Sequence, residues 1–332
     1  MIDGRKYQTI NTKYCLPVDE IEQDRLINTH YMLKHCFGSN YSAPIEGLLS
    51  HRILTCTSNS SYNSNSDASS VKSSSCFSSS TCCSLSSAWG RHTVPPRVLD
   101  LCCGSGTWVL DMATEFPHAE VYGVDFVPIY PTAIKPANAF FCKSNVLQSL
   151  PFSDSFFDYV HMRLVYNCFS NSDRKILMLS VWQFILEEIK RVLKPGGYIE
   201  LREINPIIQN PGPTASTFFA SFVKDMKRFH NVDVMWSAGL EQALSCFGPT
   251  TSAQVSVALG KEGALGESMQ RSIKDTMESY RRFFVRSKRL GPNEYDKILE
   301  IILEEGQNHE SYFTYHTCWA RKPLLSSELV LG

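Results

Sequence analysis

Short apolar runs alternate with helical stretches between residues 97 and 203 of the 332-residue chain. The runs are rich in β-branched and aromatic residues, which predicts strands at 97–101, 120–126, 139–145, 156–162 and 197–203. After the first run, apolar side chains recur at the i, i+3, i+4, i+7 spacing of a helix packed on a sheet, at Val109, Met112, Ala113 and Phe116. This alternation predicts a parallel sheet covered on both faces and joined by right-handed crossovers.

The flanking segments extend this pattern at both ends. The stretch at 19–38 predicts a helix that Gly38 ends, and the amphipathic stretch at 176–193 predicts another that stops at the sequence KPGG. Strand-like runs at 252–260 and 312–322 would complete a mostly parallel sheet of seven strands. Helices would be inserted around these late strands, over about 205–250 and 264–308.

One segment differs from the rest in composition. About half of the residues at 57–88 are serine and few are apolar, so this segment cannot bury enough surface to offset its loss of conformational entropy. We therefore predict a disordered insertion over 57–92, which separates an N-terminal helical segment (1–56) from the main domain (93–325).

Composition narrows the class of protein. With 43% hydrophobic residues the chain can bury a large core, and its net charge of -1 gives no reason to expect direct nucleic-acid binding. The polar N-terminus lacks a secretory signal, and no window has the length of a membrane span. None of the 12 cysteines forms a CxxC pair or a zinc-like cluster, so we expect reduced thiols and no metal. We expect a cytoplasmic location, and the basic run at 281–289 leaves a nuclear one open.

The loop after the first predicted strand carries the candidate chemistry. Ligands of open α/β sheets bind at the carboxyl ends of the strands, where Asp100, Gly104 and Gly106 lie between strand and helix. Glycine lets the backbone approach a ligand, and the helix N-terminus offers free N–H groups. A dinucleotide fingerprint would need a third glycine where Val109 stands, and no Lys-Ser or Lys-Thr pair follows the turn as in a phosphate-binding loop.

Two further strand ends indicate a nucleoside. Asp125 follows the glycines by about twenty residues, the distance at which a carboxylate can accept hydrogen bonds from a ribose diol. Asn145 ends the third predicted strand, where its amide could bond an adenine edge or form a turn. The ligand should then be a nucleoside without a pyrophosphate.

Taken together, these motifs resemble those of class I S-adenosylmethionine-dependent methyltransferases. The segments VLDLCCGSGTW, VYGVDF, LPFSDSFFDYVHMR and RVLKPGGYIELRE occur in the order and spacing of that family. The resemblance looks closest to a fungal group that includes the velvet-complex regulators of secondary metabolism, and it covers most of 14–45 and 97–203. It implies a Rossmann-like sheet, S-adenosylmethionine as cofactor and an N-terminal helical lid.

The resemblance also implies which residues hold the cofactor. Gly104 and Gly106 would lie against its methionine part, Asp125 would hold the ribose hydroxyls, and Asn145 would lie beside the adenine. The full set is Asp100, Cys102, Gly104, Gly106, Asp125, Phe126, Asn145 and Val146. Cys102 stands where the family's DxGxGxG pattern usually has its first glycine, and a cysteine fits there if its φ is negative.

Candidates for the catalytic groups come from the fourth and fifth predicted strands. Methyl transfer requires alignment of nucleophile, methyl group and sulfur, and it requires a base only if the acceptor must lose a proton. His161 could be that base, and Arg163 could pair with an acidic acceptor or with the cofactor carboxylate. Glu203 is a third candidate, and each of the three could instead serve the fold.

Residues outside these motifs leave two interpretations open. Trp108 could face the cofactor sulfonium or pack its helix on the sheet. Arg25 and His30 match positions of the resembling group, where this segment looks like a lid, or they are ordinary helix-face residues. Aromatic residues beyond 203 could line an acceptor pocket or belong to the core: Phe218, Phe219, Phe222, Trp236 and Tyr280.

We therefore expect an S-adenosylmethionine-dependent methyltransferase that acts on an unidentified acceptor, either a small molecule or a protein. The alternative is a regulatory protein that keeps the fold and acts by recruiting a protein partner, which the resemblance and the serine-rich segment motivate. An NAD-dependent oxidoreductase is disfavoured by Val109 and by the absence of a recognisable Tyr/Lys or Cys/His catalytic arrangement.

Overall fold

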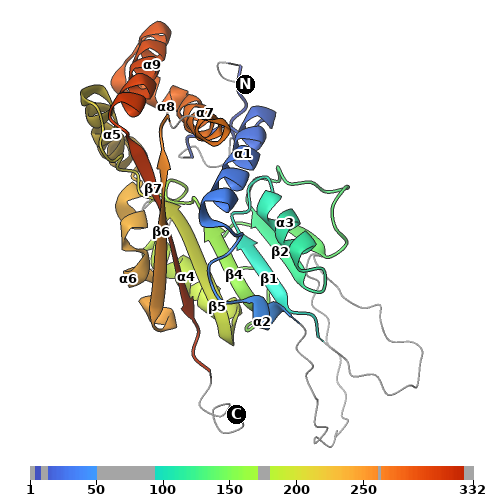
Figure 1. Cartoon of the computed structure of the whole chain (residues 1–332). Helices are drawn as coiled ribbons and strands as arrows, with labels where there is room; N and C mark the ends of the chain where they lie inside the picture. Colours follow the sequence, from blue (N-terminus) through green and yellow to red (C-terminus); the bar gives the residue numbers. More distant parts are fainter. Residues whose placement is uncertain (1–3, 9–13, 51–93, 171–179, 261–262, 325–332) are drawn as a thin grey trace, which may run out of the picture.

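A computed structural model describes residues 4–8, 14–50, 94–170, 180–260 and 263–324 (Figure 1). The predicted disordered insertion at 57–92 lies outside these residues, as does the start of the helix predicted at 176–193. None of the helices in the described ranges is long and apolar enough to cross a membrane.

A seven-stranded sheet forms the centre of the described structure. Its order is β3-β2-β1-β4-β5-β7-β6, and β1 to β5 are parallel while β7 runs antiparallel to both β5 and β6. The strands are β1 (Arg97–Leu101), β2 (Glu120–Asp125), β3 (Ala139–Lys143), β4 (Phe157–Arg163), β5 (Leu193–Ile204), β6 (Thr250–Ala258) and β7 (Tyr312–Arg321). The prediction of a mostly parallel seven-stranded sheet is confirmed.

Helices cover both faces of this sheet and one of its ends. They are α1 (Glu20–Phe37), α2 (Glu46–Leu49), α3 (Thr107–Glu115), α4 (Val181–Val192), α5 (Pro213–Asp225), α6 (Leu240–Leu244), α7 (Ala264–Ser279), α8 (Arg281–Lys288) and α9 (Pro292–Asn308). A π turn (Met226–His230) and two 3-10 turns (Val234–Gly239 and Ser245–Phe247) connect α5 to β6 around α6. The helices predicted between and before the late strands are therefore present.

Local sequence explains where the first helices begin and end. The side chain of Asp19 accepts a hydrogen bond from the backbone of Glu22 and caps α1, and Gly38 ends that helix in the left-handed conformation with φ 74°. On α3, the predicted apolar stripe buries Val109 and Met112 against the sheet. The predicted helix at 19–38 is thus confirmed.

The start of β5 differs from the prediction. The KPGG sequence does not separate α4 from the strand, because β5 begins at Leu193 and includes it. Pairing with β4 shifts register between Phe157 and Tyr159, and Gly196 has φ 76°. This shift is a β-bulge, which the left-handed conformation of Gly196 allows. The chain therefore enters the sheet four residues before the predicted strand at 197.

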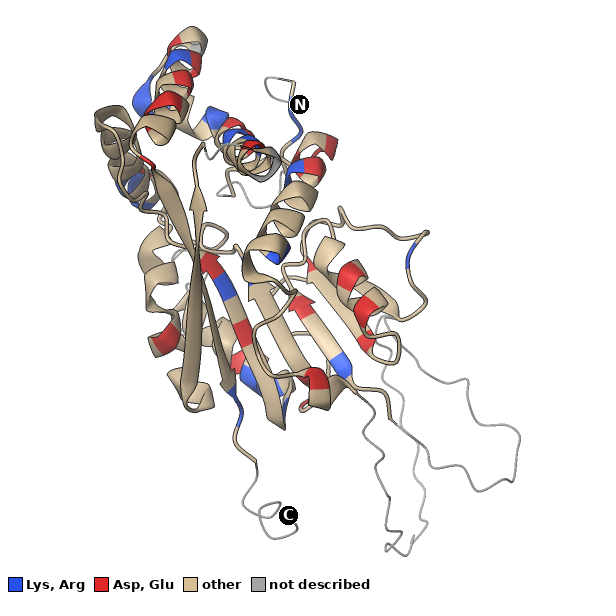
Figure 2. Ribbon diagram, viewed as in Figure 1, with Lys and Arg blue, Asp and Glu red and all other residues tan. Residues whose placement is uncertain are grey.

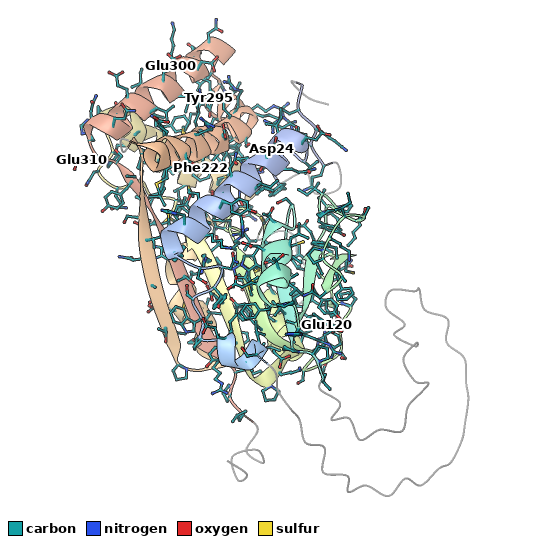
Figure 3. The ribbon with its side chains drawn as sticks, turned by 45° about the vertical axis from the view of Figure 1, so that its right-hand side comes forward. Asp24, Glu120, Phe222, Tyr295, Glu300 and Glu310 are labelled. Atoms are coloured by element: carbon teal, nitrogen blue, oxygen red, sulfur yellow. The ribbon has the colours of Figure 1, made fainter. Side chains whose placement is uncertain are left out.

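Three apolar clusters correspond to the layers of the molecule. One packs α2 and α3 on one face of the sheet, and a second packs α4 and α6 on the other. The third joins α1 to α5, α7, α8 and α9. Figure 3 shows α1 crossing between the α7–α9 helices and the parallel strands, with Phe222 and Tyr295 inside the helical group. This arrangement places α1 over one end of the sheet.

Candidate functional site

A cavity of about 440 Å³ lies at the carboxyl ends of β1 to β4, beneath α1. Its volume is within the range of small-molecule sites. The structure brings seven of the eight predicted cofactor residues to its wall: Asp100, Cys102, Gly104, Asp125, Phe126, Asn145 and Val146. Gly106 is the eighth, and it lies behind the wall at the start of α3.

The glycine loop has the backbone geometry that its sequence predicts. Gly104 and Gly106 have φ 54° and 74°, which side chains rarely adopt. A Cβ on Gly106 would lie 2.6 Å from Cε1 of Phe141, whereas a Cβ on Gly104 would meet only the end of the Leu26 side chain at 3.3 Å. Gly106 therefore shapes the turn, and Gly104 exposes backbone to the cavity.

Cys102 has a strained backbone conformation. Its φ is 58°, so the condition of a negative φ is not met, and the cysteine occupies the same left-handed region as the two glycines. Burial raises the pKa of the Cys102 and Cys103 thiols well above the usual value, which keeps them protonated. No disulfide occurs among the described residues, and no cluster of His, Cys, Asp or Glu there could hold a metal.

Asp125 fixes the loop and keeps acceptor capacity for a ligand. Its Oδ2 accepts from the Gly104 amide at 2.8 Å, and its Oδ1 accepts from the Val127 amide at 2.9 Å. Each carboxylate oxygen has a second lone pair, so the group can also accept from the two hydroxyls of a ribose. Burial raises the pKa of Asp125, and the hydrogen bonds from the backbone oppose that shift.

Asn145 forms a turn and also lines the cavity. Its Oδ1 accepts from the Leu147 amide at 3.0 Å, which is the local turn geometry anticipated as one of its two interpretations. Asn145 and Val146 still line the cavity. The turn and the ligand roles are therefore compatible.

His161 lies beneath the cavity rather than in its wall. The imidazole is fully buried, stacks on the Trp108 indole with 4.0 Å between ring centroids, and places Nδ1 2.8 Å from Oδ1 of Asp100. Burial lowers the pKa of His161 well below its usual value, so the ring is neutral and shares one hydrogen bond with the Asp100 carboxyl group. Trp108 donates its indole N–H to the Asn40 carbonyl at 2.9 Å, and it packs α3 on the sheet.

Glu203 also lies outside the cavity wall. Its buried carboxylate accepts from the amides of Val165 and Tyr166, at 2.8 and 3.3 Å, and so holds the loop that follows β4. Burial raises the pKa of Glu203 to about 8, against the effect of those two hydrogen bonds. Its contacts are those of a residue that positions this loop.

Arg163 is the charged residue that reaches the cavity from the end of β4. Within the part of the chain that the structure describes, its guanidinium has no hydrogen bond or ion pair. Burial lowers the pKa of Arg163 to about 10, and the nearby Asp100 opposes that shift. Burial likewise raises the pKa of Asp100 to about 8. A desolvated guanidinium without a partner is suited to bind an anionic group of a ligand.

Helix α1 closes the cavity from above. Its side chains Glu22, Leu26, Thr29 and His30 contribute to the wall, although no local sequence motif identifies Leu26 or Thr29 as site residues. The His30 Nε2 lies 3.0 Å from Asp111 Oδ2, and burial lowers the pKa of His30 to about 4, so the ring is neutral at pH 7. These contacts attach α1 to α3.

A buried ion pair on β5 fixes the segment that follows α1. Figure 2 shows acidic and basic positions alternating near the end of β5. The Arg202 guanidinium lies 3.0 Å from Glu200, whose other oxygen accepts from the amides of Ser42 and Ala43. Arg202 also stacks on Phe37, the last residue of α1. The position of α1 over the cavity is thus determined by the sheet itself.

Comparison with known proteins agrees with this geometry. Residues 95–255 match the family model of a methyltransferase domain. The chain therefore carries a methyltransferase domain over residues 95–255, and it is similar in sequence to fungal regulators of secondary metabolism.

Its relatives include both regulators and enzymes. It is 28% identical over 190 residues to the secondary metabolism regulator laeA of Coprinopsis cinerea, covering 57% of this chain and 35% of that protein. It is 30% identical over 143 residues to methyltransferase str3 of Strobilurus tenacellus, covering 42% and 47%. It is 34% identical over 111 residues to the regulator LAE1 of Cochliobolus heterostrophus, covering 33% of each chain. The matches thus span a third to a half of these curated relatives.

Among solved structures, one similar chain is phosphoethanolamine N-methyltransferase 2 of Haemonchus contortus in complex with S-adenosyl-L-methionine. It is 18% identical, with a TM-score of 0.40, and the match covers 69% of this chain and 49% of that one.

Proposed function

We propose that the chain transfers a methyl group from S-adenosylmethionine to an acceptor. The observation that carries the proposal is the cavity at the ends of β1 to β4. It joins the Gly104 loop, the carboxylate of Asp125 and the unpartnered guanidinium of Arg163 within a methyltransferase domain. These groups fit a nucleoside that ends in an amino acid.

Each part of the cofactor has a candidate partner in this wall. Asp125 would accept from the ribose hydroxyls, Asn145 and Val146 would lie beside the adenine, and the Gly104 loop would approach the methionine part. Arg163 would bind the methionine carboxylate. The cofactor supplies an electrophilic methyl group on a sulfonium, so the chain's residues have to position the reactants rather than form a covalent intermediate.

We propose that α1 serves as the lid of this site. Its apolar residue Leu26 and the neutral ring of His30 face the cavity, which would exclude water from the reacting groups. His161 and Glu203 would be positioning residues, since His161 holds Asp100 and Glu203 holds the loop after β4.

The eight described cysteines form no disulfide, which supports a reducing compartment, and we propose a cytoplasmic or nuclear location.

Titration of the cofactor tests the proposal. Isothermal titration should show that S-adenosylmethionine binds the full chain, and Asp125→Ala should weaken binding about 100-fold because a charged acceptor is lost. Asp125→Asn retains one acceptor oxygen and should cost about tenfold. Asp24→Ala, at an exposed position on α1 (Figure 3), is the matched control and should bind as wild type. Lack of binding by the wild-type chain at millimolar cofactor would refute the proposal.

The names of two relatives favour a second function, that of a regulator. We propose that such a regulator would act by recruiting a protein partner. The two functions are separable in a strain that lacks the gene. Rescue of its phenotype by Asp125→Ala, with the cofactor affinity lost in vitro, would favour recruitment. Failure of that variant, alongside rescue by Asp24→Ala, would favour methyl transfer.

A further inference from the structure

A second, smaller cavity of about 60 Å³ lies beyond the loop that follows β4. Helices α5, α7 and α8 surround it together with the ends of β5 and β7. Much of its wall is aromatic, formed by Tyr166, Phe219, Phe222, Tyr280, Phe284, Phe313 and Tyr315. This wall comes from the helices inserted around the late strands, and it shares no residue with the first cavity.

The loop after β4 separates the two cavities. Leu164 and Val165 face the first cavity, and the next residue, Tyr166, faces the second. The Tyr166 hydroxyl lies 3.1 Å from the hydroxyl of Tyr280, which also accepts a hydrogen bond from the Asn167 side chain. Glu203 fixes the backbone of this loop from behind. The second cavity is therefore adjacent to the cofactor cavity across one stretch of chain.

The lid helix forms the other boundary between the cavities. Thr29 of α1 lines the first cavity, and its hydroxyl lies 3.3 Å from that of Ser272, which lines the second. Arg25 of α1 donates to the Thr276 hydroxyl at 3.3 Å. Helix α1 therefore lines the first cavity and contacts the wall of the second.

The second cavity contains no charge. Every polar side-chain group on its described wall is a hydroxyl, and burial raises the pKa values of Tyr166 and Tyr280, which keeps both phenols neutral. The nearby Arg25 is paired with Glu22 at 2.6 Å. The carboxylate of Glu203 is engaged by two backbone amides. A charged group placed here would lose its hydration without gaining a counter-ion.

We propose that this cavity receives an uncharged, apolar group of the methyl acceptor. The inference rests on the proposed methyl transfer and deepens it, because it names the acceptor class as a small neutral molecule with an alkyl branch or ring edge. A volume of about 60 Å³ admits a group of a few heavy atoms. To reach the cofactor cavity, the remainder of the acceptor would displace the hydroxyl contacts that separate the two cavities, Tyr166 with Tyr280 and Thr29 with Ser272.

A size-matched set of fluorinated probes tests this proposal. The probes are 3-(trifluoromethyl)phenol, 3-(trifluoromethyl)benzoate and 3-(trifluoromethyl)benzylammonium, observed by ¹⁹F NMR with the full chain saturated by S-adenosylhomocysteine. The neutral phenol should bind at least about tenfold more tightly than either ion. Its trifluoromethyl group should show an Overhauser contact with the methyl groups of Ile273, which lines the cavity.

Two variants locate the binding. Ile273→Phe fills the cavity and should weaken phenol binding at least about tenfold while leaving cofactor binding unchanged. Ile302→Phe makes the same substitution in the same apolar cluster, away from both cavity walls, and should bind the phenol as wild type. If Ile273→Phe does not fold, the Overhauser contact in the wild-type chain decides the question.

Three results would overturn the proposal: preferred binding of the benzylammonium or benzoate, phenol binding that Ile273→Phe leaves unchanged, or no contact between the phenol and Ile273. Absence of binding by all three probes would also overturn it. Failure of the proposed methyl transfer is detected separately by cofactor titration. The probes are also measured without S-adenosylhomocysteine, so loss of cofactor binding does not obscure the result.

Discussion

The two cavities are built in opposite ways. The cofactor cavity takes its wall from strand ends and the loops that follow them, with exposed backbone and the charged groups Asp125 and Arg163. The second cavity takes its wall from aromatic side chains that are far apart in sequence, such as Tyr166 and Phe313, and it carries no charge. This difference indicates that the first cavity recognises a ligand by hydrogen bonds and charge, whereas the second recognises one by shape and apolar contact.

The largest effect is expected from a methyl group on the glycine turn. Gly106→Ala combines a positive φ with a contact of 2.6 Å to Phe141, and we expect a loss of about 3 kcal/mol in stability together with loss of cofactor binding. Gly104→Ala has a similar φ but meets only the flexible end of Leu26, so about 1 kcal/mol should be lost. Thermal unfolding and cofactor titration measure both. Equal losses would show that the Phe141 contact does not restrict this turn.

Removal of the charge at Arg163 should have the next largest effect. Arg163→Met keeps much of the side-chain volume but loses the guanidinium, and it should weaken S-adenosylmethionine binding about 10- to 30-fold. Binding of decarboxylated S-adenosylmethionine should change less than about threefold, because that compound lacks the carboxylate. If Arg163→Met weakens the binding of both compounds by the same factor, Arg163 supports the fold of the cavity instead of binding the carboxylate.

The sequence predicts the first cavity better than the second, for a physical reason. The strands, α3 and the Gly104 loop are specified by residues close together in the chain, so periodicity and spacing predict them. The stack of His161 on Trp108 and the hydroxyl contact of Tyr166 with Tyr280 join segments 53 and 114 residues apart, and no local pattern encodes such contacts. The early start of β5 depends on a bulge at Gly196 that the sequence alone does not distinguish from a turn.

The pH dependence of stability tests the carboxylate that supports the loop between the cavities. Burial raises the pKa values of Glu203 and Asp100 from 4.5 and 3.8 to about 8, so the folded chain holds protons that the unfolded chain releases. Their contribution is fully present below the unfolded pKa values and is lost as the pH rises through about 8. His30 and His161 have lowered pKa values and act in the opposite direction, but only below their unfolded value of 6.5.

The free energy of unfolding should therefore fall between pH 6.5 and pH 8, by about 1.5 kcal/mol for each carboxyl group. Glu203→Gln removes one of the two groups and should reduce the fall by about half, although its overall stability is lower because one backbone amide loses its acceptor. Urea unfolding at a series of pH values provides the measurement. An equally steep fall in Glu203→Gln would show that Glu203 does not bind the extra proton.

The smallest effect is expected at Cys102, where the glycine of the family pattern is replaced. Cys102→Gly relieves a positive φ worth about 1 kcal/mol, but glycine also gains freedom in the unfolded chain, so stability should change by less than about 1 kcal/mol. The thiol is protonated and therefore uncharged, so its removal takes no charge from the cavity wall. Cofactor affinity should accordingly change less than about threefold. Cys102→Ala keeps the strained Cβ and removes only the sulfur. If both variants lose affinity tenfold or more while remaining folded, the sulfur itself contacts the cofactor, and the wall of the first cavity depends on more than backbone and charge.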